Sequence, residues 1–291
     1  MFSIVAPQVR GKCAEDNIFA ANNRAVALAD EIGNDKVVNG TVGSILDEEG
    51  NLAVLDVVLE AYKRLTPRQI CAYAPIKGYE KFLESCIDQC FGHSRPDGYI
   101  EACATPGGTG VLHHVIHNYA VPGDEILITD WHWGAYNSLI DYPNNKVSTF
   151  EFLNEEGQFN LVSFREKVDE ILNRQKNLVI ILNGIANNPT GYSMSVSEWQ
   201  AAVDVLKAAV EGKDKNVILV PDVAYLDYSG EKEECRKFFK VFGNLPKNIL
   251  VIVAYTLSKG FTLYGKRQGA MIAVTSDKDE AKEVVEDKQN A

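Results

Sequence analysis

Apolar and polar residues alternate in two different patterns along most of this chain. Short apolar runs of strand length are followed by longer segments in which apolar residues recur every three or four positions, as on one face of a helix. The predicted strands are residues 100–104, 125–129, 147–152, 178–183, 217–222, 250–255 and 270–275. The predicted helices include residues 111–120, 161–174, 197–210 and 232–239. Before the third of these helices, Ser195 and Glu198 have the spacing of a capping box. Strands that alternate with helices predict an α/β fold, in which a mostly parallel seven-stranded sheet is sandwiched by helices.

The two ends of the chain depart from this alternation. Residues 1–45 combine a helical pattern around residues 22–32 with an irregular stretch at 38–44, and we expect them to form an N-terminal arm and part of a smaller domain. Residues 46–275 carry the alternating pattern and are predicted to form the large domain. Residues 276–291 begin a charged helix, which we interpret as the start of a C-terminal segment of the smaller domain.

Composition and charge narrow the classes of function. With 29 basic and 40 acidic residues the net charge is −11, which argues against a nucleic-acid partner, because phosphates require a basic surface. The longest apolar runs are too short to span a bilayer, and the first residues do not have the pattern of a signal peptide. Six cysteines are scattered along the chain, which favours reduced thiols and a cytoplasmic location.

Two pairs of side chains have a spacing that suits a metal ion. Cys86 with Cys90 and His113 with His117 are each four residues apart in a helical pattern. The histidines lack the accompanying glutamate of a zinc-protease motif. Half-buried cysteines and surface or half-buried histidines are the simpler interpretation, so we predict that the protein holds no metal.

The segment with the most chemical content lies after the predicted strand at residues 250–255. Lys259 stands at the end of this strand, where burial would lower the pKa of its amine and allow it to form a Schiff base with a carbonyl. Thr256 and Ser258 precede the lysine and Arg267 follows it, and hydroxyls with an arginine suit a phosphate. An ordinary surface turn is the alternative. A ligand with both an aldehyde and a phosphate points to pyridoxal phosphate.

Other strand ends carry side chains that fit the same cofactor, because ligands bind at the carboxyl ends of parallel strands. The glycine turn at residues 107–110 either cradles a phosphate or is only a tight turn. Trp133 either stacks on a planar ring or packs in the core. Asn188 and Tyr225 can bond a phenolate oxygen, although Asn188 also fits a simple turn. Asp222 either pairs with a pyridinium nitrogen or caps a helix.

Taken in order, these motifs give the chain a resemblance to a known family. It resembles the class I aminotransferases of fold type I, nearest the aspartate and aromatic branch, over roughly residues 35–275. The motifs that carry the resemblance are Gly107-Gly108-Thr109-Gly110, the Trp133 region, Asn188-Pro189-Thr190-Gly191, Asp222-Val223-Ala224-Tyr225, Ser258-Lys259-Gly260-Phe261 through Arg267, and Tyr73-Ala74-Pro75-Ile76 with Gly78. The first five of these motifs occur in the family's order, which makes the resemblance specific.

The resemblance implies a role for each matching residue in binding pyridoxal 5'-phosphate. Lys259 would hold the cofactor covalently and, once freed by the substrate amine, would move the substrate proton. Asp222 would keep the pyridine nitrogen protonated, and Asn188 and Tyr225 would bond the ring oxygen. Trp133 would stack on the ring. The residues that would hold the phosphate are Gly108, Thr109, Thr256, Ser258 and Arg267.

The resemblance also implies a partner chain and a substrate side. Tyr73 would reach the phosphate bound by a second copy, so a homodimer is expected. Gly43, with Trp133 and Asn188, would lie near the substrate. The chain departs from the family at Gly107, where many relatives have a serine, and in its length. Because relatives continue past the position that matches Ala291, we expect the small domain, and with it the arginine for the substrate carboxylate, to be incomplete in this sequence.

Three functions follow from this interpretation. The first is an aminotransferase that moves an amino group from an L-amino acid, of aspartate or aromatic type, to a 2-oxo acid by a ping-pong mechanism. The second is a pyridoxal-phosphate-dependent lyase or decarboxylase of the same fold. The third is a chain that binds the cofactor without turnover. The substrate cannot be assigned from these residues.

Overall fold

The computed structural model describes residues 4, 17–41 and 43–289, and the chain divides into two compact units, Met1–Asp56 and Val57–Ala291. In the first unit the helix α1 (Asn17–Ile32) is followed by a short 3₁₀ helix (Asn34–Lys36). The side chain of Asn22 accepts hydrogen bonds from Asn39 Nδ2 at 2.9 Å and from the Thr41 hydroxyl at 3.3 Å, which ties the following segment to the helix. The predicted helix around residues 22–32 is confirmed and starts five residues earlier.

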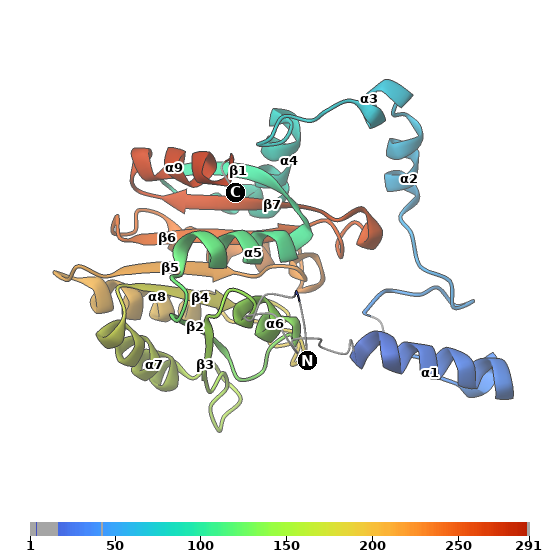
Figure 1. Cartoon of the computed structure of the whole chain (residues 1–291), viewed down its shortest axis with the longest axis horizontal. Helices are drawn as coiled ribbons and strands as arrows, with labels where there is room; N and C mark the ends of the chain where they lie inside the picture. Colours follow the sequence, from blue (N-terminus) through green and yellow to red (C-terminus); the bar gives the residue numbers. More distant parts are fainter. Residues whose placement is uncertain (1–3, 5–16, 42, 290–291) are drawn as a thin grey trace. The chain divides into compact units, whose positions relative to one another are not determined.

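The second unit is built on one seven-stranded sheet (Figure 1). Its strands are β1 (Tyr99–Pro106), β2 (Glu125–Thr129), β3 (Lys146–Phe150), β4 (Asn177–Leu182), β5 (Asn216–Pro221), β6 (Ile249–Thr256) and β7 (Gln268–Thr275). The strand order is β1-β7-β6-β5-β4-β2-β3, and β7 runs antiparallel to both of its neighbours while the other pairs are parallel. All seven predicted strands are present, and the prediction of a mostly parallel sheet is confirmed.

Helices cover both faces of this sheet, as an α/β fold requires because each face is apolar. The helices that follow α1 in the chain are α2 (Asp56–Lys63), α3 (Pro67–Cys71), α4 (Glu80–Phe91), α5 (Gly107–Tyr119), α6 (Ala135–Asp141), α7 (Leu161–Arg174), α8 (Val196–Val210) and α9 (Lys278–Gln289), of which α4 to α9 pack on the sheet. The 3₁₀ helices of this unit are η3 (Gly92–Ser94), η4 (Leu226–Tyr228), η5 (Glu234–Phe242) and η6 (Tyr264–Lys266).

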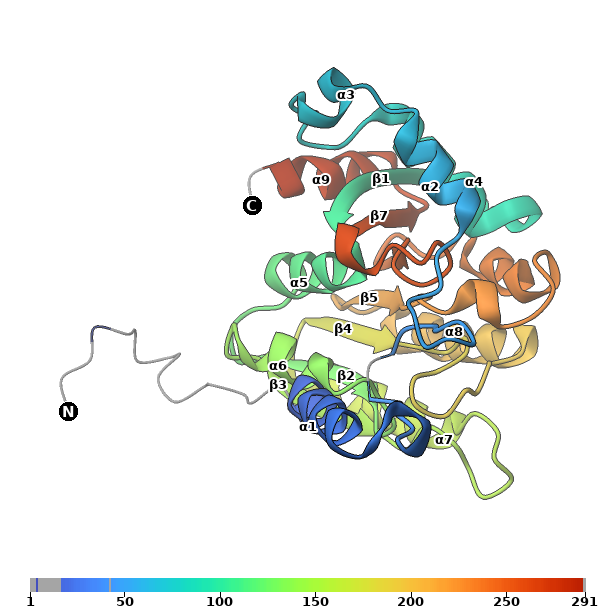
Figure 2. The ribbon, with the colours of Figure 1, turned by 90° about the vertical axis from the view of Figure 1, so that its right-hand side faces the viewer.

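The core lies in two layers, one on each side of the sheet. Leu112 and Val115 of α5, Ile140 of α6 and Val284 of α9 pack on one face. Residues of α4, α7, α8 and η5 pack on the other. Helix α9 lies beside β1 and β7 in both views of the molecule (Figure 1, Figure 2).

Local sequence signals explain where several of these elements begin. The capping box before α8 is confirmed, because the Ser195 hydroxyl accepts from the Glu198 amide while the Glu198 carboxylate accepts from the Ser195 amide. Two predictions needed correction. The helix predicted at residues 232–239 is the 3₁₀ helix η5, and α5 begins at Gly107 rather than at residue 111, so the glycine turn is itself the first turn of the helix.

The two pairs of side chains with metal-like spacing lie on α4 and α5. Cys86 and Cys90 are buried on α4, and burial raises the pKa of the Cys86 thiol to about 12. The His113 and His117 rings stack on α5 with their centroids 6.2 Å apart. Among the described residues, no group of three or more histidine, cysteine or carboxylate side chains is placed to hold a metal. The same residues include no helix of the length and apolarity that crossing a membrane requires.

Candidate functional site

A pocket opens at the carboxyl ends of the parallel strands, where a sheet of this kind places its ligands. The cavity has a volume of about 170 Å³. The lining residues are Gly108, Thr109, Leu112, Trp133, Tyr136, Asn183, Asn188, Asp222, Ala224, Tyr225, Thr256, Ser258, Lys259, Tyr264 and Arg267. They come from loops and element ends that lie up to 159 positions apart in sequence (267 − 108).

At one end of the pocket, Asp222 presents a buried carboxylate just after β5. Oδ2 accepts a hydrogen bond from the Tyr136 hydroxyl at 2.6 Å, and Oδ1 accepts one from the Ala224 amide at 3.1 Å. Burial raises the pKa of this carboxyl, and the two hydrogen bonds partly oppose the effect. A buried carboxylate with this environment gains from a cation placed in the pocket.

Asn188 and Tyr225 converge on the middle of the pocket. The Asn188 side-chain amide lies 3.5 Å from the Tyr225 hydroxyl. The Asn188 backbone amide donates to Asn183 Oδ1 at 2.6 Å, and the Asn183 side chain donates to the Asp222 carbonyl at 2.8 Å. Asn183 therefore links the loop after β4 to the end of β5, which holds Asn188 and Asp222 in the same wall of the pocket.

Lys259 enters the pocket from the loop after β6. Its Nζ lies 5.3 Å from the centroid of the Tyr225 ring and 5.2 Å from that of the Tyr264 ring. Burial lowers the pKa of this amine, and the positive charge of Arg267 lowers it further. A larger fraction of the amine is therefore neutral near pH 7 than for a solvated lysine, which makes it a better nucleophile and base.

The opposite end of the pocket is built to receive an anion. The amino terminus of α5, with Gly108 and Thr109, contributes a helix dipole and backbone N–H groups. Thr256 and Ser258 place their buried hydroxyls 3.1 Å apart. Arg267 Nη1 donates to Ser258 Oγ at 3.4 Å, so a cation stands beside these donors.

Most of the predicted site residues therefore meet in one pocket. Trp133 lines the pocket with its ring edge-on to Tyr136, at 5.7 Å between centroids. Tyr73 is fully exposed in the segment after α3, outside the pocket. Gly43 belongs to the first unit, so its predicted place near the substrate stays a prediction.

Sequence reasoning missed several pocket residues, of which Tyr136 and Tyr264 carry chemistry. Tyr136 is three residues after Trp133 on α6, and its hydroxyl meets Asp222 from a position 86 residues away in sequence. The sequence gives no helical signal for this residue, because Trp133 lies before the start of α6 (Ala135–Asp141). Tyr264 follows Lys259 by five residues and begins the 3₁₀ helix η6, which is too short for a periodic pattern to indicate the direction of its side chains.

The sheet and its pocket define an α/β protein of the fold type I class. The chain belongs to the aminotransferase class I and II family, whose model matches residues 35–288. It is 26% identical to the aspartate aminotransferase of Pseudomonas aeruginosa and 25% identical to the aromatic-amino-acid aminotransferase of Escherichia coli, over 85% of this chain in each case. The chain spans 61% and 62% of the length of these two relatives.

Solved structures agree with this family. The crystal structure of an aminotransferase from Anaerococcus prevotii is 34% identical and superposes with a TM-score of 0.96 over 99% of this chain, which covers 72% of that protein. A mitochondrial aspartate aminotransferase from Trypanosoma brucei is 26% identical with a TM-score of 0.69, over 86% of this chain and 64% of that one.

Aspartate and aromatic aminotransferases use pyridoxal phosphate, and the pocket residues fit this group. The buried Asp222 carboxylate suits a protonated ring nitrogen. Lys259 offers an amine with a lowered pKa for an aldehyde. The hydroxyls beside Arg267 suit a phosphate. An anionic group, a reactive carbonyl and a cationic nitrogen on one ligand thus find complementary groups in one cavity.

Proposed function

We propose that this protein is a pyridoxal-phosphate-dependent aminotransferase that moves an amino group from an L-amino acid to a 2-oxo acid. The observation that carries the proposal is the pocket in which the buried Asp222 carboxylate and the desolvated Lys259 amine stand together. Relatives named aspartate and aromatic-amino-acid aminotransferases support an amino acid of one of these two types as substrate. When bound, the cofactor supplies an electron-accepting ring that stabilises negative charge at the amino-acid Cα.

Each pocket residue has a part in this proposal. Lys259 Nζ would hold the cofactor covalently and, once the substrate amine has displaced it, would accept the proton from the substrate Cα. Asp222 would keep its negative charge for a protonated ring nitrogen, helped by the hydrogen bond from Tyr136. Asn188 and Tyr225, whose polar atoms lie 3.5 Å apart, would both donate to the ring oxygen. Trp133 would cover one side of the ring, and we propose that the substrate lies near Trp133, Asn188 and Gly43.

The phosphate end anchors the cofactor without taking part in proton transfer. Thr256 and Ser258 contribute hydroxyls, Arg267 a positive charge, and Gly108 and Thr109 the amino terminus of α5. Thr256 ends β6, Arg267 directly precedes β7, and Gly108 and Thr109 begin α5, so these groups would hold one end of the ligand fixed while the Lys259 end reacts.

We also propose that the protein is a homodimer in which Tyr73 reaches the cofactor of the partner copy. In support, the segment from α2 to Tyr79 exposes several large apolar side chains, and apolar side chains gathered on a surface are typical of a protein–protein interface. They are Val57, Leu59, Leu65, Ile70, Tyr73, Ile76 and Tyr79.

The division into a large domain at residues 46–275 and small-domain parts at 1–45 and 276–291 remains part of the same proposal. A cytoplasmic location is supported by Cys71, Cys86, Cys90 and Cys235, which are free thiols.

The attachment of the cofactor gives the first test. We expect the protein to form an adduct with pyridoxal phosphate that borohydride traps on Lys259, and the Lys259→Ala variant to lose it entirely, since Lys259 is the one lysine among the described residues that line the pocket. Lys266→Ala is the matched control, because Lys266 lies in the same loop outside the pocket and should keep the full yield. Mass spectrometry locates the adduct.

The type of reaction is read from a half-reaction with aspartate or an aromatic amino acid. A transaminase converts the cofactor to its amine form with one equivalent of 2-oxo acid. Release of ammonia or carbon dioxide would assign the lyase or decarboxylase function instead. An adduct that persists in the Lys259→Ala variant would place the attachment elsewhere and overturn the assignment of the site.

A further inference from the structure

The backbone that carries Lys259 is held by residues that do not line the pocket. The Lys259 carbonyl accepts a hydrogen bond from the Thr262 amide at 2.9 Å, which closes the loop after β6 on itself. It also accepts one from the Tyr228 hydroxyl at 2.7 Å. Tyr228 belongs to η4, so this second bond joins the lysine loop to the segment after β5.

The next residue of the lysine loop is in contact with the same segment. A Cβ built on Gly260 would collide with the Asp227 carboxylate, so the carboxylate lies directly against the glycine backbone. A larger residue at position 260 would have to displace either the loop or Asp227. Two consecutive residues of η4, Asp227 and Tyr228, thus contact two consecutive residues of the lysine loop.

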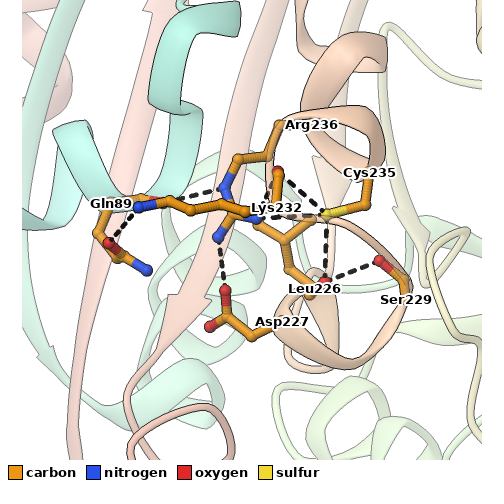
Figure 3. A network of polar contacts seen from close by, with 7 residues as sticks. All are labelled: Gln89, Leu226, Asp227, Ser229, Lys232, Cys235 and Arg236. Atoms are coloured by element: carbon orange, nitrogen blue, oxygen red, sulfur yellow. Dashed lines mark hydrogen bonds and ion pairs between the residues drawn. The ribbon is translucent and has the colours of Figure 1, made fainter.

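Asp227 is itself anchored by a buried arginine (Figure 3). Arg236 Nη2 donates to Asp227 Oδ1 at 2.5 Å, and the arginine side chain is 0% exposed while that of Asp227 is 28% exposed. The carboxylate therefore uses one oxygen for the arginine and turns the other toward Gly260. A charged hydrogen bond to a fully buried partner restricts the carboxylate far more than a surface ion pair would.

The arginine is fixed in turn by backbone groups of other elements. Its Nε donates to the Gln89 carbonyl of α4 at 3.1 Å, and its Nη1 donates to the Lys232 carbonyl at 2.9 Å. Nη1 also lies 3.3 Å from Cys235 Sγ. Figure 3 shows these groups around the guanidinium on the side away from Asp227. Since the guanidinium presents five N–H donors in a rigid plane, bonds on all sides leave it little freedom to move.

We propose that Asp227, held by Arg236, and Tyr228 are positioning residues that fix the Lys259–Gly260 backbone and so direct Lys259 Nζ into the pocket between the Tyr225 and Tyr264 rings. This inference rests on the proposed function, in which Lys259 is the attachment point. Neither Asp227 nor Tyr228 lines the pocket, so both act through the backbone of the lysine loop rather than on the ligand.

The test measures how fast the protein, freed of cofactor, forms the borohydride-reducible adduct on Lys259 as the pyridoxal phosphate concentration is raised. The limiting rate depends on the orientation of Lys259 Nζ. The half-saturating concentration depends on how tightly the phosphate residues bind the cofactor. We expect Tyr228→Phe to lower the limiting rate about tenfold and Asp227→Ala about a hundredfold, the range known for small misplacements of a reacting group. The half-saturating concentration should stay within about twofold, because the phosphate residues are untouched.

Two further variants separate positioning from a general loss of structure. Tyr142→Phe removes the hydroxyl of an exposed tyrosine on another helix end and should react like the wild-type protein. Asp227→Asn keeps an acceptor for Arg236 and should restore most of the rate lost in Asp227→Ala. Thermal unfolding is recorded for each variant, and if Asp227→Ala does not fold, Tyr228→Phe decides alone.

The outcomes distinguish this inference from the proposal on which it rests. A wild-type protein that forms no adduct on Lys259 overturns the proposed function and this inference with it. A wild-type protein that forms the adduct, together with a folded Tyr228→Phe variant of unchanged limiting rate, overturns only the positioning role. A parallel change in limiting rate, half-saturation and unfolding temperature would assign Asp227 and Tyr228 to the fold alone.

Discussion

At the scale of single residues, the charge of Asp222 depends on the balance between its burial and its hydrogen bonds, one of which comes from Tyr136. Burial raises the pKa of the Asp222 carboxyl from its ordinary value of 3.8, while hydrogen bonds from the Tyr136 hydroxyl and the Ala224 amide lower it. Burial also raises the pKa of Tyr136 well above its ordinary value, so this hydroxyl keeps its proton and remains a donor at neutral pH. The tyrosine therefore stabilises the charged form of a carboxylate that its surroundings disfavour.

We predict that Tyr136→Phe weakens the binding of pyridoxal phosphate and makes it more sensitive to acid. A hydrogen bond to a charged group contributes about 1.5–3 kcal/mol, so affinity at pH 7 should fall about tenfold or more. Because the lost bond lowered the pKa of Asp222, its loss raises that pKa, and binding should fail at a higher pH than in the wild-type protein as the pH is lowered.

Cofactor titrations between pH 5 and pH 8 check this prediction, with Tyr142→Phe as the matched control. An affinity whose pH dependence matches that of the wild type would show that Tyr136 does not influence Asp222.

At the scale of elements, the turn from β1 into α5 fits Arg267 closely because position 107 is a glycine. Gly107 has φ +72°, which a residue with a side chain adopts only with strain. A Cβ at this position would lie 3.1 Å from Arg267 Nη2. The serine that many relatives carry here would thus press on the guanidinium in this chain, so we interpret Gly107 as the residue that lets Arg267 approach the helix amino terminus.

We predict that Gly107→Ala loses both stability and phosphate affinity. The left-handed conformation should cost roughly 1–2 kcal/mol of stability. Displacement of Arg267 should in addition weaken the binding of inorganic phosphate about tenfold, the value of one charge-assisted hydrogen bond.

Gly157→Ala is the matched control for this variant. Gly157 has φ +73° but nothing within 4 Å of a built Cβ, so it should lose the same stability and keep the phosphate affinity. Urea unfolding and phosphate titration separate the two effects. Equal phosphate affinities in the two variants would contradict the role given to Gly107.

At the scale of the whole molecule, one sheet assembles a site from segments that are distant in the sequence. The parallel strands β2, β4, β5 and β6 bring their carboxyl ends to one edge, where Asn188, Asp222 and Lys259 follow three of them. Strand β7 returns antiparallel between β1 and β6, which sets Arg267 at its start beside the turn into α5. The proposed dimer would add Tyr73 to this set from a second copy.

We predict that mixed dimers reveal whether Tyr73 acts on the partner's site. Dimers of the Tyr73→Phe chain alone should bind the cofactor about tenfold more weakly, because each site loses one hydrogen bond to the phosphate. Dimers of the Lys259→Ala chain alone should form no adduct. In a mixed dimer, the site with an intact Lys259 would receive Tyr73 from the other chain and should regain wild-type affinity.

The measurement is a cofactor titration of dimers reassembled from the two variants, with dimers of Tyr73→Phe alone as the reference. Sedimentation must show that dimers form. A mixed dimer that binds no better than the Tyr73→Phe reference would place Tyr73 within its own chain's site, and a monomer in sedimentation would contradict the dimer itself.

Much of the fold and of the site could be predicted because both depend on patterns that are local in the sequence. An apolar run predicts a strand such as β2, and a capping box predicts the start of α8. Both patterns can be found in the sequence because each spans only a few residues. The residues that follow each strand, among them Asp222 and Lys259, could be named because a parallel sheet gathers its strand ends at one edge.

What the sequence determined by itself is therefore the set of elements, the α/β class and the residues at the strand ends. Only the tertiary structure decided that β7 lies antiparallel between β1 and β6, that Tyr136 donates to Asp222, and that Arg236 holds Asp227 against the lysine loop. The physical reason is that these last features join residues far apart in the chain. No periodicity within a segment records which distant strand or side chain it will meet, because that partner is selected only when the whole core packs.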